Sequence, residues 1–325
     1  MTEIQTTRLY GPIAEDLVLV EDLLESAKRV DIFALRKMLE HALESRGKRL
    51  RPALVLLAGT FGEYDLNKLV PLGTAIELLH TASLVHDDVI DGADNRRGKP
   101  TANSLFNNAL TVLLGDFLFA NAAEMVTRTG SLKVTRLFAL TLMKMTNGEL
   151  DQDTAAFDVG RDVQSYLSRI GGKTASLVEN ATEGGAVLAG CSEKDVESLR
   201  SYGYNLGMAF QIVDDILDFQ GTEELMGKPV GSDLKEGTIT LPTLLYLQSA
   251  SREDVVRKFL ETEKDRESYL QDAIKKITNS SAMIESQKFA EDYVTRARTA
   301  LQSLPNNDGR ERLEGLGDYV LERNN

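Results

Sequence analysis

The sequence of 325 residues contains a single cysteine, Cys191. One thiol excludes an intramolecular disulfide and any metal site built from several cysteines. Because cysteine is among the residue types most often found inside proteins, we expect Cys191 to be a small buried side chain and not a catalytic thiol.

Long apolar runs and an excess of basic residues are also missing. No stretch approaches the roughly 18 uncharged apolar residues of a membrane-spanning helix, and the N-terminus lacks the basic start and apolar run of a signal peptide. The net charge of −13 argues against general nucleic-acid binding, which requires a basic surface. We therefore expect a soluble, cytoplasmic protein with no nucleic-acid partner and no transmembrane segment.

Alternating strand patterns are scarce, whereas helical spacing recurs. In "GYNLGMAFQIVDDILDF", apolar residues follow one another at intervals of four, three and four: Leu206, Phe210, Val213 and Leu217. Such a stripe is typical of an amphipathic helix, so we expect an all-α fold. No change of composition marks a boundary, and we expect a single domain over 1–325 with a short N-terminal arm at about 1–12.

One long irregular segment stands out, "QGTEELMGKPVGSDLKEGTITLP", at 220–242. Glycine and proline punctuate it, which predicts a loop. A loop of this length within a compact helical domain is more often functional than idle.

Two acidic motifs of the form D-D-x-x-D occur between apolar residues, at Asp87, Asp88 and Asp91 and again at Asp214, Asp215 and Asp218. The first and last aspartates of each motif are four apart, so they share a helix face, where like charges repel. Cations would neutralise them, and all-oxygen ligands without His or Cys favour Mg²⁺ bound through few carboxylates and substrate phosphates. The alternative is two acidic stripes that face water.

Basic residues accompany these motifs in four places, and the positions that enter the later argument are Lys48, Arg51, Arg96, Arg97, Lys173 and Lys228. Guanidinium and ammonium groups beside metal-binding carboxylates suit a diphosphate. "GGKT" is not a P-loop, because Leu167 stands where the first glycine is required and no strand precedes it.

Together the blocks "GKRLRP", "ELLHTASLVHDDVIDGADNRRGKPTAN", "GDFLFA", "NGELDQ", "YLSRIGGKTASL", "GMAFQIVDDILDF", "GKPVGSDLKEGTITLP" and a closing "LQSLPNNDGRERLEGLGDYVLER" resemble the trans-isoprenyl diphosphate synthase family, the polyprenyl synthetases. The likeness extends over residues 47 to about 323. It implies a helical bundle around a deep central cavity, usually dimeric. It also implies head-to-tail condensation of isopentenyl diphosphate onto an allylic diphosphate, with Mg²⁺, three ions per active site.

The resemblance also implies roles for individual residues. Asp87 and Asp91 would bind two Mg²⁺ ions with support from Asp88, and Asp214 would bind a third, with Asp215 and Asp218 acting partly through waters. The isopentenyl diphosphate site would consist of Lys48, Arg51, His80 and Arg97. The allylic diphosphate would be held by Arg96, Lys173 and Lys228. Thr174 and Gln211 would turn dipoles toward the developing cation, so that they count with Asp87, Asp91, Asp214 and Lys173 as catalytic.

Three further positions set expectations. Thr238 stands where many members have a lysine before "TLP", which leaves a gap at the allylic diphosphate that Lys235 only partly fills. Ser83 and Ala82 lie four and five residues before Asp87, and a helix rises about 5.4 Å per turn, close to one isoprene unit. Small side chains there leave the floor of the cavity open and predict a long product, C30–C50.

Alternatives remain. An aromatic ring from Phe117 or Phe138 could close the cavity sooner and give a shorter product, C15–C20. A non-catalytic subunit of a heteromeric synthase would usually lose one of the motifs, and a terpene cyclase would usually replace the second. His86 lies on another helix face than Asp87, so we expect it to pack against neighbours and not to bind metal.

Overall fold

A computed structural model describes residues 10–44, 48–96, 98–221 and 230–322. These ranges are almost entirely helical, which confirms the all-α prediction. The elements of the first half are η1 (Gly11–Ile13), α2 (Asp16–Ala27), α3 (Phe33–Ala42), α4 (Leu50–Gly59), α5 (Leu66–Ile90), β1 (Asn95–Arg96), β2 (Lys99–Pro100), α6 (Ala102–Phe106), α7 (Asn108–Arg128) and α8 (Leu132–Thr154). Those of the second half are α9 (Val163–Ile170), η2 (Gly171–Ala175), α10 (Ser176–Leu188), α11 (Glu193–Gln220), α13 (Ser232–Lys235), α14 (Leu241–Ser249), α15 (Val255–Glu261), α16 (Glu267–Thr278), α17 (Ser281–Leu301) and α18 (Asp308–Glu322).

The chain divides into two compact units. Unit 1 comprises Met1–Thr141, Leu177–Gly203 and Ala300–Leu316, and unit 2 comprises Leu142–Ser176, Tyr204–Thr299 and Gly317–Asn325. The expectation of one domain over 1–325 stays a prediction.

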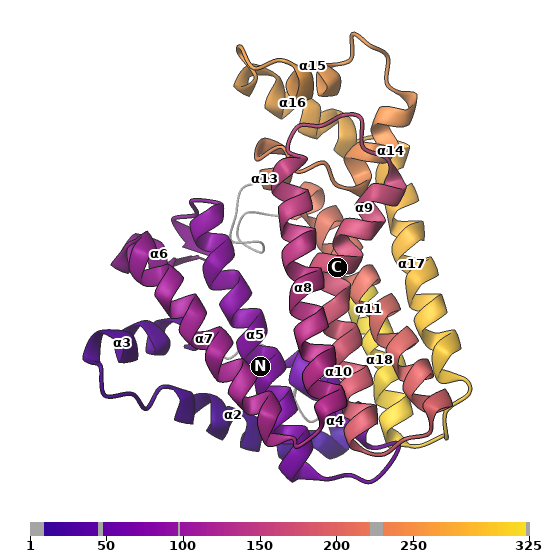
Figure 1. The fold of residues 1–325 in the computed structure, drawn as a ribbon. Helices are drawn as coiled ribbons and strands as arrows, with labels where there is room; N and C mark the ends of the chain where they lie inside the picture. Colours follow the sequence, from indigo (N-terminus) through magenta and orange to yellow (C-terminus); the bar gives the residue numbers. More distant parts are fainter. Residues whose placement is uncertain (1–9, 45–47, 97, 222–229, 323–325) are drawn as a thin grey trace. The chain divides into compact units, whose positions relative to one another are not determined.

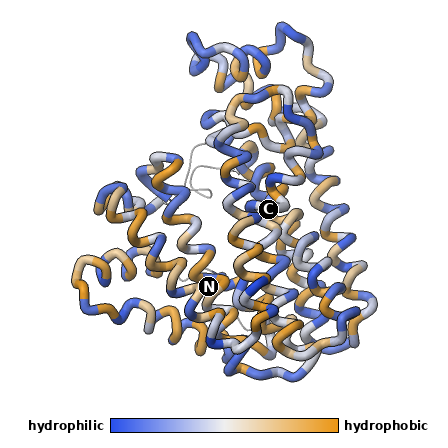
Figure 2. Tube along the Cα trace, viewed as in Figure 1, coloured by the Kyte–Doolittle hydropathy of each residue, from blue (hydrophilic) through white to orange (hydrophobic). Residues whose placement is uncertain are grey.

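In unit 1, α5 is the central helix. It begins after Asp65, whose carboxylate accepts a hydrogen bond from the Asn67 amide at 3.0 Å, a helix cap. Apolar side chains of α4 and α5 are fully buried, among them Leu54, Leu57, Leu72 and Ile76. Helix α7 lies alongside α5 (Figure 1). Apolar residues are frequent in these helices (Figure 2), and the runs Pro52 to Gly59 of α4 and Leu69 to Leu79 of α5 are buried on every face, as in a core helix.

In unit 2, Phe157 anchors the neighbouring helices α15 and α16. Its ring centroid lies 6.2 Å from that of Phe259 and 3.6 Å from the guanidinium carbon of Arg266. Its amide donates to the carbonyl of Gly237 at 2.9 Å, which ties the segment before α14 to the same cluster. The cation–π contact of Phe157 with Arg266 and the buried ring of Phe259 stabilise this end of the unit.

Several local expectations were wrong. The segment 220–242 is not loop throughout, because α13 forms within it and α14 begins at Leu241. Most of the arm expected at about 1–12 lies outside the described residues, and Tyr10 within it is fully buried. Cys191 is only half-buried. A small antiparallel pair, β1 with β2, was not expected, and it pairs Asn95 with Pro100.

Helix α7 is longer and more apolar than the sequence pattern indicated. By length and composition it could cross a membrane, although 39% of its most apolar window is buried within the protein. It contains no long uncharged run, because the charged residues Asp116 and Glu124 stand within it. A single such helix is weak evidence, because core helices of other proteins pass the same test.

Candidate active site

The first acidic motif lies at the C-terminal end of α5, where the helix leaves the core of unit 1. Burial decreases along it: Ala82 is fully buried, Asp87 is half-buried and Asp91 is exposed. Asp88, on another face of the helix, is buried, with 6% of its surface exposed. Asp87 and Asp91 are therefore the members of the motif that face outward together, as their spacing predicted.

Asp88 is held by an ion pair. Its Oδ1 accepts a hydrogen bond from Nε of Arg96 at 2.6 Å, and Arg96 lies on β1. This contact fastens the β1–β2 hairpin to the motif, and it suits the supporting role predicted for Asp88. Arg97, the next residue of the hairpin, lies outside the described residues.

Three further predicted residues belong to unit 1. Lys48 is exposed just before α4, and Arg51 is half-buried in its first turn. His80 is half-buried on α5, and the Ser83 hydroxyl donates to its carbonyl oxygen at 2.8 Å. Ser83 thus turns its hydroxyl back along the helix, one turn before Asp87.

His86 has the packing role that we expected. Its ring lies against α7, with Nε2 3.1 Å from the carbonyl oxygen of Val112 and 3.7 Å from Oδ1 of Asp116. The ring also makes an edge contact with Phe119 at 5.2 Å between centroids. A β-carbon on Gly115 would lie 2.1 Å from Nε2, so the close approach of α5 and α7 at this point requires glycine.

In unit 2, Lys173 and Thr174 lie on η2, one turn of π-helix. Such wide turns are rare and occur often at functional sites. Nζ of Lys173 lies 2.6 Å from Oε2 of Glu149 on α8. The two elements touch because residue 148 is glycine: a β-carbon there would lie 2.6 Å from the amide nitrogen of Lys173.

A chain of hydrogen bonds continues from Thr174. Its hydroxyl donates to Oε1 of Gln211 at 2.7 Å, and Nε2 of Gln211 donates to Oδ1 of Asp215 at 2.8 Å. The hydroxyl of Tyr166 donates to the other carboxylate oxygen of Asp215 at 2.6 Å. Burial raises the pKa of Asp215, and the negative charge of Asp233 raises it further. The structure thus joins Thr174 and Gln211 to Asp215 and adds Tyr166, and the role of Thr174 and Gln211 in the reaction stays a prediction.

The other two aspartates of the second motif differ in burial. Asp214 is half-buried, whereas Asp218 has 1% of its surface exposed. The Asp233 amide, in the first turn of α13, donates to Oδ2 of Asp218 at 3.3 Å, and the Gly231 amide donates to its carbonyl at 2.8 Å. Asp218 therefore holds the chain that returns after 222–229. Lys228 lies outside the described residues.

The donor set fits Mg²⁺. The motifs offer only carboxylate oxygens, which are hard ligands, and burial disfavours the charge of Asp215, which a nearby cation would favour. Among the residues that the structure describes, no three acidic, His or Cys side chains come close enough to hold a metal ion by themselves. That agrees with an ion held by one or two carboxylates and completed by diphosphate oxygens and water.

Sequence reasoning missed Glu149, Tyr166 and Arg169. Arg169 is buried, donates through Nη2 to the Ile239 carbonyl at 3.1 Å and lies 5.6 Å from the Tyr166 ring centroid. Each of the three stands in a block that carried the resemblance, "NGELDQ" or "YLSRIGGKTASL". Their partners are distant in sequence, so the blocks alone did not disclose their contacts.

Each unit of this helical protein carries acidic and basic side chains of the types that suit metal and diphosphate. Comparison with known proteins identifies the family. The polyprenyl synthetase model matches residues 33–277, and the chain belongs to the polyprenyl synthetase family.

Relatives agree with the long-chain class. Heptaprenyl diphosphate synthase component 2 of Bacillus subtilis is 38% identical over 97% of this chain and 90% of its own length. The crystal structure of a decaprenyl diphosphate synthase from Rhodobacter capsulatus has a TM-score of 0.91 at 36% identity, covering 98% of this chain and 99% of that one. A polyprenyl synthase from Caulobacter crescentus, complexed with calcium and isoprenyl diphosphate, has the same score and identity, covering 98% and 97%.

Proposed function

We propose that the protein is a prenyltransferase that condenses isopentenyl diphosphate head-to-tail onto an allylic diphosphate and releases an all-trans polyprenyl diphosphate of C30–C50. The observation that carries the proposal is the repeated motif. In both copies the middle aspartate, Asp88 or Asp215, is buried and held by protein donors, while its neighbour Asp87 or Asp214 is more exposed. Membership of the family and the long-chain relatives support the reaction class.

In the proposed reaction, Asp87, Asp91 and Asp214 hold Mg²⁺, three ions per site. When bound, these ions would withdraw charge from the allylic diphosphate and favour its departure. Lys173 and Arg96 hold the same diphosphate, with Lys228 as a further expected contact, whereas Arg97 is expected at isopentenyl diphosphate. Lys48, Arg51 and His80 hold isopentenyl diphosphate with its double bond toward the carbon that loses its oxygen.

The remaining steps concern charge and protons. The allylic C–O bond breaks, and the electron pair goes to the departing diphosphate. The isopentenyl double bond attacks the resulting cation. The new cation then loses a proton, and the departing diphosphate is the proposed acceptor because the chain offers no obvious side-chain base. The Thr174 hydroxyl donates a hydrogen bond to the side-chain oxygen of Gln211, whose amide nitrogen donates to Asp215. In the proposed reaction the dipoles of Thr174 and Gln211 stabilise the cation.

Water must be excluded, because it would quench the cation. The segment 220–242 is the proposed lid. It is anchored at both of its described ends, by α11 up to Gln220 and by the Asp218 contacts around α13. We further propose a cytoplasmic homodimer.

The test is product analysis. Purified protein is supplied with radiolabelled isopentenyl diphosphate, Mg²⁺ and one of three allylic starters of increasing length, and products are separated by chain length. We expect products of six to ten isoprene units and no turnover after chelation, restored by added Mg²⁺. Turnover that survives chelation, or a product that does not incorporate isopentenyl diphosphate, contradicts the proposal.

A second candidate is a catalytic subunit that needs a partner. Its basis is that the Bacillus subtilis relative is named component 2 of its synthase, and the other long-chain relatives do not favour it. The same assay decides between the two, since a chain that needs a partner will be inactive alone although it folds and binds diphosphates.

A further inference from the structure

The turn before α4 carries Lys48 and Arg51, which the proposed function assigns to isopentenyl diphosphate, and the inference below rests on that assignment. Between them stands Arg49, which has no role in the reaction as proposed. Its side chain is only 10% exposed, although arginine is rarely buried unless it is paired.

Arg49 adopts a left-handed backbone conformation, with φ 49° and ψ 37°. Residues other than glycine adopt it at a cost, because the β-carbon crowds the backbone. Such positions persist where the surroundings over-determine them and are frequent at functional sites. Arg49 is also the N-cap residue of α4, and its carbonyl accepts a hydrogen bond from the Ala53 amide at 3.0 Å.

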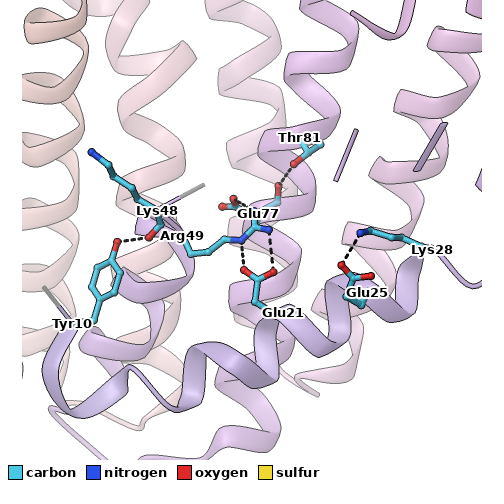
Figure 3. A network of polar contacts seen from close by, with 8 residues as sticks. All are labelled: Tyr10, Glu21, Glu25, Lys28, Lys48, Arg49, Glu77 and Thr81. Carbon is cyan, nitrogen blue, oxygen red and sulfur yellow. Dashed lines mark hydrogen bonds and ion pairs between the residues drawn. The ribbon is translucent and has the colours of Figure 1, made fainter. Parts of the chain in front are cut away.

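Three N–H groups of Arg49 hold the turn in place (Figure 3). Nε and Nη2 donate to the two carboxylate oxygens of Glu21 on α2, the second at 3.1 Å. Nη1 donates to Oε1 of Glu77 on α5 at 2.9 Å. Only the planar guanidinium fork can serve two carboxylates in this way, since an ammonium group presents a single point of charge.

Glu77 connects the turn to the substrate site. It is buried, with 7% of its surface exposed, and stands on α5 three residues before His80. The Thr81 hydroxyl donates to its carbonyl at 2.9 Å. Arg49 therefore fixes the beginning of α4 at the level of α5 from which His80 projects.

The backbone next to Arg49 is held from the other direction. The hydroxyl of Tyr10, itself fully buried, donates to the carbonyl oxygen of Lys48. Figure 3 shows the side chains of Lys48 and Arg49 leaving the chain in opposite directions. With its carbonyl and its neighbour both anchored, the backbone of Lys48 is held, and with it the direction in which the side chain leaves the chain.

We propose that Arg49 is a positioning residue for the diphosphate of isopentenyl diphosphate: its contacts with Glu21 and Glu77 hold the left-handed turn that presents Lys48 and Arg51. Arg49 touches no substrate. It acts through the two cations beside it, and its loss weakens the site for isopentenyl diphosphate without changing the allylic site.

The test is Arg49→Lys, which keeps the charge and loses the fork. We expect the KM for isopentenyl diphosphate to rise about tenfold or more, since a displacement of about 1 Å costs that much or more. The KM for the allylic substrate should change less than about twofold. Tyr10→Phe and Glu21→Gln, which touch the turn at other points, should shift the same constant in the same direction.

Arg200→Lys is the matched control. Arg200 also holds one glutamate with two N–H groups, Glu197 at 2.8 and 2.5 Å, and a second, Glu179, at 3.0 Å. The fork is equally lost, on α11 and not in the turn. We expect Arg200→Lys to lower Tm and to leave both KM values unchanged.

A fall in Tm for Arg49→Lys with unchanged KM values, or an equal rise in both, would show a merely structural role and overturn the inference. If Arg49→Lys does not fold, Glu21→Gln decides by the same split of KM values. An inactive wild-type chain would instead contradict the proposed function itself, so the two failures are distinguishable.

Discussion

Asp87 and Asp214 have equivalent places in the two motifs: each precedes a buried aspartate and is itself half-buried on its helix. This arrangement divides the work within a motif. The buried member contacts Arg96, or Tyr166 and Gln211, and in the proposed function the more exposed member lies where a ligand that arrives with the substrate can reach it.

We predict that Asp87→Ala or Asp214→Ala lowers turnover by several orders of magnitude. Metal-ion stabilisation supplies several kcal/mol, and each ~1.4 kcal/mol is a factor of ten in rate. Folding should persist, because the change removes like-charge repulsion on the helix. Steady-state kinetics and thermal unfolding measure both. Asp272→Ala, on the exposed surface of α16, is the control, and near-normal turnover in either motif variant contradicts the metal assignment.

A second prediction concerns Ala82, which is fully buried on α5 one turn before the motif. Ala82→Phe should shorten the product by closing the floor of the proposed cavity. Adding a ring to a packed position should also destabilise the fold by about 1–3 kcal/mol. Ala82→Gly is the control, and chromatography of the products reports chain length. An unchanged distribution in Ala82→Phe would place the floor elsewhere, with Phe117 or Phe138 as candidates.

The sequence predicts the roles of some residues and not of others. The aspartates could be predicted because a four-residue spacing fixes a common helix face whatever surrounds it. Arg49 and Tyr166 could not, because their partners lie 28 and 49 residues away and no local period relates such positions. Their roles follow only from contacts between helices.

The π-turn η2 depends on its neighbour α8, and Gly148 is the point of contact. Gly148→Ala would place a β-carbon 2.6 Å from the Lys173 amide nitrogen, a backbone atom that cannot move aside cheaply. We predict a loss of about 1–3 kcal/mol in the free energy of unfolding and a higher KM for the allylic substrate. Denaturant unfolding and kinetics test this.

Gly315→Ala is the matched control for that change. Gly315 lies within α18 and a β-carbon there meets nothing within 4 Å. Alanine should therefore stabilise the helix by about 0.4–1 kcal/mol. If Gly148→Ala is as well tolerated as Gly315→Ala, the close approach of α8 and η2 does not set the geometry of Lys173.

The segment after α13 carries a further prediction. Thr238 is half-buried, and its amide donates to the Asp233 carbonyl at 2.8 Å. Lys235 is exposed and lies 3.5 Å from Glu267, so its charge is already engaged at the surface. Thr238→Lys should lower the KM for the allylic substrate and leave that for isopentenyl diphosphate unchanged. Thr295→Lys adds the same charge on the exposed face of α17 as a control, and unchanged constants in Thr238→Lys place residue 238 away from the phosphates.

Elements were predictable where burial is periodic. The apolar stripe from Leu206 to Leu217 predicted the C-terminal half of α11. The prediction succeeded because the apolar residues that pack against the core recur there with the period of a helix. Between 220 and 242 glycine and proline predicted a loop, yet α13 forms because Asp218 accepts from its first turn. The β1–β2 hairpin was missed for a similar reason, since the ion pair of Arg96 with Asp88 helps to hold a strand of two residues.

At the scale of the whole molecule, we predict how the chains assemble. We expect a homodimer that is active without any other subunit. Sedimentation equilibrium should give twice the mass of the 325-residue chain, and activity per chain should fall on dilution below the dissociation constant. A monomer with full activity contradicts the dimer, and a folded chain without activity favours a heteromeric synthase.

The bond between Tyr166 and Asp215 has an optical consequence. The sequence contains no tryptophan, so the near-ultraviolet absorbance of the protein comes largely from its nine tyrosines. The phenol of Tyr166 donates a hydrogen bond to the Asp215 carboxylate. A cation bound nearby would attract negative charge of that carboxylate and weaken the hydrogen bond, which shifts the phenol absorption band. The protein therefore carries its own reporter of metal at the second motif: a difference spectrum on adding Mg²⁺ and diphosphate should be present in the wild type and absent in Tyr166→Phe.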